Sequence, residues 1–250
     1  FIASYLPENK VTQKWLNYSY TELQKEFSNQ FNEDGTNFEG STNYHCLSLE
    51  FVIYTTAIFL NKKNNGKYSF NEEYFNKMFK AIKFIEDIAK ENREIPLIGD
   101  NDSGKFIKLL PFYEKHNSKD LKKRFINLKN YSPIQNKYLL ENTLIKDDVI
   151  TAGLGLFKTD NLKSNNYFSI YKSIIQNLSS FNQKVPKINV NNEHIITTKV
   201  QISKYLNLYR EIENDKKQKY EFFLPENWQD ELKLLFYKDF GLYLYKSKKI

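Results

Sequence analysis

The chain has 250 residues, enough to bury a substantial core, and its 20 Phe and 18 Tyr exclude a disordered chain because so much ring surface leaves water. Its 37 Lys and Arg outnumber its 30 Asp and Glu, and the net charge of +7 suits either solubility or a polyanionic partner. One cysteine, Cys46, excludes an intrachain disulfide framework, and no apolar stretch reaches the roughly 18 residues of a membrane span.

The first half of the chain is predicted to form three amphipathic helices. Their apolar residues recur at steps of three and four, which lines one face of each helix. These runs cover residues 16–31, 47–58 and 75–85. Ser41 or Thr42 is well placed to cap the second helix, and Asn71 the third. The short polar links predict antiparallel neighbours, the unit of a helical bundle or an α/α toroid.

The pattern weakens beyond Pro96. Residues 103–130 are predicted to hold two helical pieces, broken around Pro111 and the KHNSKD stretch. Residues 131–200 are rich in Asn, Ser and Lys and are predicted to form only short elements.

The last residues differ from the rest. Residues 242–245, LYLY, form a short apolar and aromatic run that predicts a strand. We therefore expect a mainly α-helical domain over residues 1–235 and the truncated start of a β-domain over residues 236–250.

Several familiar motifs are incomplete. The stretch GLGLFK at residues 153–158 has Lys158 where the third glycine of a dinucleotide site belongs. The three histidines lack the spacing of a zinc site, and DNDSG at residues 100–104 lacks the closing Glu of a calcium loop. No helix-turn-helix, zinc-finger or RNA-binding signature accompanies the positive charge. We expect no metal, no cofactor and no nucleic acid.

The stretch QFNEDGTNFEGSTNYHCLSLEF, residues 30–51, carries the candidate site. If a helix begins near Ser41, Tyr44 lies in its first turn, where the positive end of the helix dipole stabilises a phenolate and lowers the pKa of the tyrosine. His45 is offset by about 100° around the helix and could contact another atom of the same ligand. Glu39 could accept hydrogen bonds from sugar hydroxyls.

A structural interpretation competes with this one. Tyr44 lies three positions before Leu47 on the same apolar stripe, and periodicity alone favours a core tyrosine. A single histidine in a first turn is more often a capping or surface group. The pattern by itself leaves both interpretations open.

Two separated blocks carry a resemblance to a known family. The block KWLNYSYTELQKEFSNQFNEDGTNFEGSTNYHCLSLEF, residues 14–51, resembles the W, Q, DGxNFEGSxxYH and acidic residue of the heparinase II/III-like family. The block IGDNDSGKF, residues 98–106, is similar to the family's GDxDxGR segment. DFGLYLYK at residues 239–246 is weakly similar to the first strand of the family's C-terminal β-sandwich.

The resemblance implies an incomplete α/α toroid followed by a β-sandwich, with a cleft that binds an acidic polysaccharide. Active members cleave uronate polymers by β-elimination: a base removes the C5 proton, polar or cationic groups neutralise the carboxylate, and an acid protonates the departing oxygen. The resemblance further implies a location in the periplasm or cell envelope. The chain starts at Phe1, which suggests a processed or truncated product.

The resemblance also implies roles for particular residues. Tyr44 matches the family's proton-transfer tyrosine, which serves as base, acid or both, and His45 matches its recurrent neighbour. Glu39, Asp102 and Lys105 are expected to line the sugar cleft. The family's neutralising Asn-His pair would lie upstream of Phe1 and its β-sandwich histidine after Ile250. Lys105 stands where the family tends to have Arg, so the bidentate fork for a carboxylate is lost.

Two other functions compete with a lyase. The same scaffold could be a non-catalytic carbohydrate-binding or surface-polysaccharide assembly protein, as the missing Asn-His pair suggests. Hydrolysis by Asp100 and Asp102 is a weaker alternative, because residues two apart on a turn seldom face a substrate from opposite sides.

Overall fold

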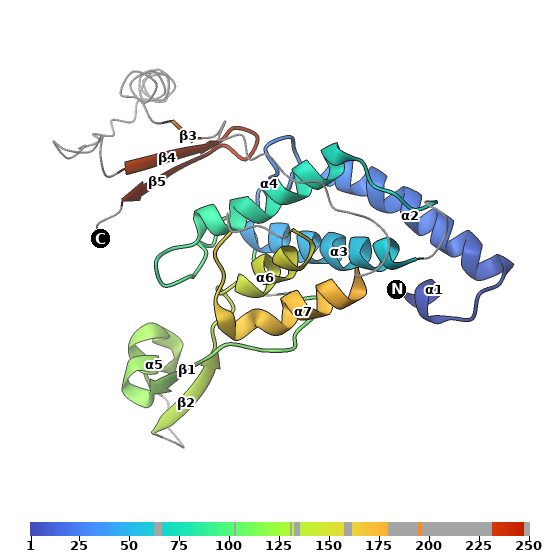
Figure 1. Cartoon of the computed structure of the whole chain (residues 1–250). Helices are drawn as coiled ribbons and strands as arrows, with labels where there is room; N and C mark the ends of the chain where they lie inside the picture. Colours follow the sequence, from blue (N-terminus) through green and yellow to red (C-terminus); the bar gives the residue numbers. More distant parts are fainter. Residues whose placement is uncertain are drawn as a thin grey trace.

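The computed structural model describes residues 1–62, 67–102, 104–130, 132, 136–157, 162–179, 195–196 and 232–247. This part of the chain is mainly helical and carries two small antiparallel sheets at one end of the helical body (Figure 1). None of its helices is long and apolar enough to cross a membrane.

The three predicted helices are confirmed, but the second is buried on most sides and is not amphipathic as predicted. They follow a short helix α1 and are α2 (Lys10–Gln30), α3 (Thr42–Asn61) and α4 (Glu72–Ile88); α1 covers Ile2–Tyr5. The Ser41 side chain caps α3 by accepting the N–H of Tyr44, and Asn71 caps α4 by accepting that of Tyr74. Helix α2 begins earlier than the periodicity indicates, because Asn9 and Thr12 form a reciprocal capping box.

Helix α3 is the centre of the core. It is buried along most of its length, and α4, α6 (Asp147–Leu156) and α7 (Ser169–Leu178) pack against it (Figure 1). The two glycines of the incomplete nucleotide motif lie in α6: a Cβ at Gly153 would lie 2.5 Å from Ile82, and one at Gly155 would lie 2.6 Å from Ile175. Both glycines therefore serve close helix packing. Lys158, the last residue of the motif, lies outside the described residues.

A lobe projects from the helical body between α4 and α6 (Figure 1). It consists of strand β1, helix α5, a 3-10 turn η1 and strand β2, with Tyr113 paired to Glu141 and Asn117 to Lys137. Its elements cover Tyr113–Asn117, Ser118–Arg124, Ile126–Leu128 and Lys137–Glu141.

The prediction for residues 103–130 is wrong at two points. KHNSKD does not break a helix but ends β1 and starts α5, which Asn117 caps by accepting the N–H of Asp120. The described residues before Pro111 form no helix, because side chains of other helices accept their backbone N–H groups. The Glu50 carboxylate accepts the N–H groups of Phe106 and Ile107. The Tyr171 hydroxyl accepts those of Leu109 and Leu110.

The predicted C-terminal strand is confirmed as β5 (Leu242–Ser247). It pairs with β4 (Leu232–Tyr237), which the sequence pattern missed, and β4 pairs with the short β3 (Ile195–Ile196). The boundary expected between residues 235 and 236 falls inside β4. The short elements expected within residues 131–200 include β2, α6, a 3-10 turn at Asn166–Phe168 and α7.

Candidate functional site

The candidate site begins in the loop between α2 and α3, which is fixed against α4. Gly35 has φ of +86°, and a Cβ there would lie 2.6 Å from the backbone of Lys80 and Ala81. The Asp34 carboxylate accepts the backbone N–H of Thr36 at 3.0 Å. The glycine of the EDG turn thus lets the loop pack directly on a helix backbone.

His45 holds this loop from inside the protein. It is fully buried between the rings of Phe31 and Phe84, at centroid distances of 5.4 and 4.8 Å. Its Nδ1 accepts the backbone N–H of Asn37 at 3.1 Å, which leaves Nε2 to donate to the carbonyl of Ala81 at 2.9 Å.

The surroundings of His45 keep it neutral. Burial lowers the pKa of His45 to about 4, against the raising effect of its bond to Ala81. His45 is neither a capping nor a surface group, and both of its ring nitrogens are engaged by the backbone. In this arrangement it positions the loop and does not face solvent.

A second loop, residues 96–107, closes over the first turn of α3. The Thr42 hydroxyl donates to the carbonyl of Pro96 at 2.8 Å, and the Ser41 hydroxyl donates to that of Asp100 at 2.6 Å. Gly99 has φ of +71°, and a Cβ there would lie 2.6 Å from the carbonyl oxygen of Gly40. The two blocks of the sequence resemblance therefore meet in space, and this contact brings Asp102 to Tyr44.

Tyr44 lies partly exposed at the mouth of this arrangement. Its hydroxyl donates to Asp102 Oδ2 at 3.4 Å. The carboxylate of Asp102 is the main cause that raises the pKa of Tyr44, and desolvation, Asp100 and Glu39 add to the effect. The expected lowering of the pKa by the helix N-terminus is therefore wrong. The structure brings Tyr44, Glu39 and Asp102 together.

Lys105 lies deeper than expected and is paired within the protein. Its ammonium lies 2.8 Å from Asp148 Oδ2, and the two side chains are 10% and 1% exposed. Burial is the largest single effect and lowers the pKa of Lys105, but the charge and hydrogen bond of Asp148, together with Tyr171 and Glu50, raise it above the ordinary value. Lys105 therefore anchors the loop to α6.

Three side chains of this polar cluster were not singled out in the sequence, Asn43, Lys146 and Asp148, and Glu50 entered only as the acidic residue of the motif. Lys146 is buried and donates to Asn43 Oδ1 at 2.6 Å, while Asn43 Nδ2 donates to Asp102 Oδ1 at 3.4 Å. A polar chain thus runs from Lys146 to the carboxylate beside Tyr44. Its sequence signal was the charged triplet KDD directly before the largely apolar run of residues 149–156.

Glu50 had its own signal, a carboxylate within the apolar run of α3. It is 2% exposed and accepts the N–H groups of Phe106 and Ile107 at 2.7 and 3.0 Å. Burial raises the pKa of Glu50, against the lowering effect of these two hydrogen bonds. Cys46 nearby is buried, and burial raises the pKa of its thiol to about 12, as expected for an inert cysteine.

The loop contacts around Tyr44 involve the DGxNFEGSxxYH and GDxDxG blocks, and the family comparison covers both. Residues 1–120 match the family model of the heparinase II/III N-terminus. These residues belong to the heparinase II/III-like family. No curated protein and no solved structure matches the chain significantly. The match ends within the lobe, so β2, α6 and Lys146 lie beyond the part of the chain that the heparinase II/III N-terminus covers.

Proposed function

We propose that the protein is a polysaccharide lyase that cleaves a uronate-containing acidic polysaccharide by β-elimination. The observation that carries this proposal is the partly exposed Tyr44 hydroxyl beside Asp102, in the first turn of a helix whose two flanking loops are fixed by buried contacts. Membership of residues 1–120 in the heparinase II/III-like family supports it. The antiparallel helices α2, α3 and α4 fit part of an α/α toroid.

We assign Tyr44 the role of acid. A phenol holds its proton at neutral pH, and Asp102, which raises the pKa of Tyr44, disfavours the phenolate that a base would need. In the elimination, the C5 proton leaves to a base, its electron pair forms the C4–C5 double bond, and the C4–O bond breaks. Tyr44 then gives its proton to the departing glycosidic oxygen.

The other site residues divide into two groups. Glu39 and Asp102 are exposed and face the same mouth as Tyr44, where they accept hydrogen bonds from sugar hydroxyls. His45, Asn43 and Lys146 are buried and act as positioning residues. Lys105 fixes its loop to α6 through its pair with Asp148 and does not carry the free charge that the resemblance implies.

A carbohydrate-binding protein without elimination chemistry is the second candidate. Two observations favour it. Lys105 forms an ion pair with Asp148 and so does not offer a free positive charge to a substrate carboxylate. The charged side chains that raise the pKa of Tyr44 are all acidic. We also propose a location in the periplasm or cell envelope, which cell fractionation followed by immunoblotting would test.

Replacing Tyr44 with Phe in the full-length protein tests the lyase proposal. The phenyl ring keeps the packing, but the transferable proton is lost, so we expect kcat to fall by a factor of about 100 or more. Turnover is followed by the ultraviolet absorbance of the unsaturated uronate product on a panel of acidic polysaccharides.

Tyr18→Phe is the matched control, because Tyr18 is an exposed tyrosine on α2. Unchanged turnover in Tyr44→Phe would remove Tyr44 from the chemistry. Binding of a polymer without any product absorbance in the parent protein would establish the binding alternative.

A further inference from the structure

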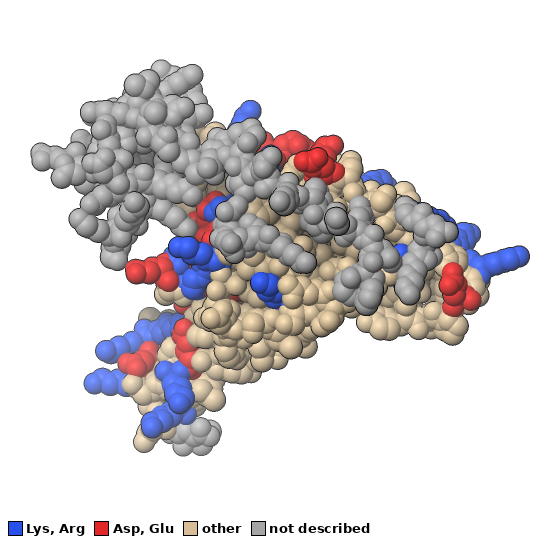
Figure 2. Space-filling model, in the orientation of Figure 1, with Lys and Arg blue, Asp and Glu red and all other residues tan. Residues whose placement is uncertain are grey.

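The lobe carries most of the chain's excess positive charge. Residues 113–141 hold seven Lys and Arg against three Asp and Glu, a net charge of +4 out of +7 for the whole chain. The basic residues are Lys115, Lys119, Lys122, Lys123, Arg124, Lys129 and Lys137. All are exposed except Lys122, which is half-buried, and Figure 2 shows the blue side chains gathered on this projection.

The acidic and the basic side chains of the lobe differ in the contacts that they make. Among the described residues, none of the seven basic side chains forms an ion pair. Two of the three acids are engaged at the base of the lobe. Glu114 accepts from Asn142 Nδ2 at 2.7 Å, and Glu141 is paired with Lys108. The positive charge therefore faces solvent with little internal compensation.

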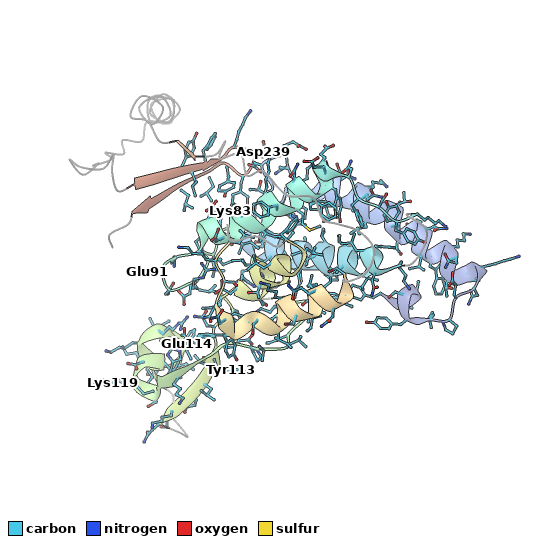
Figure 3. All side chains as sticks on the ribbon, viewed as in Figure 1. Lys83, Glu91, Tyr113, Glu114, Lys119 and Asp239 are labelled. Carbon is cyan, nitrogen blue, oxygen red and sulfur yellow. The ribbon has the colours of Figure 1, made fainter. Side chains whose placement is uncertain are left out.

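Apolar side chains accompany the cations. Tyr113, Phe125 and Leu139 are 53%, 40% and 62% exposed, and the guanidinium of Arg124 lies 5.6 Å from the centroid of the Phe125 ring. Figure 3 labels Tyr113 and Lys119, which both belong to the lobe. Cations beside exposed rings suit a ligand that alternates carboxylates with the apolar faces of sugar rings.

Both connections of the lobe lead into the candidate site. Lys105 precedes β1 and contacts Asp148, while Lys146 follows β2 and contacts Asn43. Asn142 fixes the base by donating to both Glu94 and Glu114 at 2.7 Å. The base of the lobe is therefore joined on both sides to residues of the candidate site.

The charged groups around Tyr44 are acidic. Glu39, Asp100 and Asp102 all act on Tyr44 with negative charge, so the mouth repels an anionic polymer. A long-range attraction for an anionic polymer would have to come from another part of the molecule, and the lobe holds most of the excess positive charge.

We propose that the lobe, residues 113–141, is a docking surface for an acidic polysaccharide, which it holds outside the reacting residues and directs to the site at Tyr44. The identity of the polymer rests on the proposed function. The electrostatic docking itself requires no elimination chemistry, so the two proposals fail separately.

The test compares polymer and oligomer binding in the full-length protein. The lobe variant replaces Lys119, Lys123 and Lys129 with Gln, and the matched control replaces the exposed α2 residues Lys10, Lys14 and Lys25 with Gln. The probes are polygalacturonate, its trimer, and a single-stranded oligonucleotide of similar charge. Binding is measured by calorimetry at low and high salt, after circular dichroism has shown that each variant is folded.

We expect the lobe variant to bind polygalacturonate about tenfold more weakly at low salt, with little change for the trimer, and the control variant to bind like the parent. Equal polymer binding in lobe variant and parent would overturn the proposal, and so would equal losses in the two variants. Tighter binding of the oligonucleotide than of the polyuronate would assign the surface to nucleic acid instead. Turnover in Tyr44→Phe tests the lyase proposal independently of these results.

Discussion

His45 shows how one buried side chain makes stability depend on pH. Its pKa of about 4 in the folded protein lies below the ordinary value near 6.5, so the unfolded chain binds the proton more tightly. The neutral form therefore contributes full stability above about pH 6.5, and that contribution is lost as the pH falls toward 4. We expect the free energy of unfolding to drop by up to about 3 kcal/mol in this window, measured by urea denaturation.

The His45→Gln variant separates this contribution from that of the carboxylates. A glutamine can accept from Asn37 and donate to Ala81 without titrating, so its unfolding free energy should change less between pH 6.5 and 4. Parallel pH dependences in the two proteins would show that His45 is protonated equally in the folded and unfolded states.

At the scale of elements, Glu50 joins α3 to the loop that carries Asp102 and Lys105. Glu50→Ala leaves the N–H groups of Phe106 and Ile107 without their acceptor in a half-buried loop. We expect the free energy of unfolding to fall by about 2 to 4 kcal/mol and the amide hydrogens of this loop to exchange faster. Urea denaturation and hydrogen exchange measure the two effects.

Glu50→Gln is the conservative comparison. It keeps one acceptor oxygen and removes a buried charge, so it should cost less stability than alanine and protect at least one of the two amides. An alanine variant with unchanged exchange at Phe106 and Ile107 would mean that Glu50 does not hold the loop.

At the scale of the whole molecule, the C-terminal sheet is attached to the helical body through Tyr237. This buried side chain of β4 donates to Asp87 Oδ2 of α4 at 2.8 Å, and its ring packs against Phe84 at 4.7 Å. Asp239 adds a backbone contact, its N–H donating to Asp34 at 3.0 Å. Figure 3 labels Asp239 at the junction of the sheet with the helices.

Tyr237→Phe keeps the ring contact and removes the hydroxyl bond to Asp87. We expect a loss of about 1 to 2 kcal/mol in the free energy of unfolding, together with faster hydrogen exchange in β4 and β5. Replacing the exposed Tyr18 with Phe should change stability by less than about 0.5 kcal/mol. Equal stabilities of Tyr237→Phe and the parent would show that the ring alone attaches the sheet.

The long helices were predictable because their signals are local. Periodicity and the caps at Ser41 and Asn71 located α3 and α4. The capping box of Asn9 and Thr12, which sets the start of α2, was not used in the prediction. Residues 103–112 were not predictable, since Glu50 and Tyr171 supply the acceptors that a helix would otherwise provide. Strand β4 was missed for a similar reason, because its partners are β5 and α4.

The three long helices, the C-terminal strand and the family of residues 1–120 could be read from the amino-acid sequence, because periodicity, caps and motif spacing are properties of the chain. The burial and pairing of the site residues depend on tertiary contacts. These contacts bury His45, pair Lys105 with Asp148 and place Asp102 beside Tyr44. Burial and neighbouring charge set a pKa, and both depend on residues that the fold brings together from distant parts of the chain.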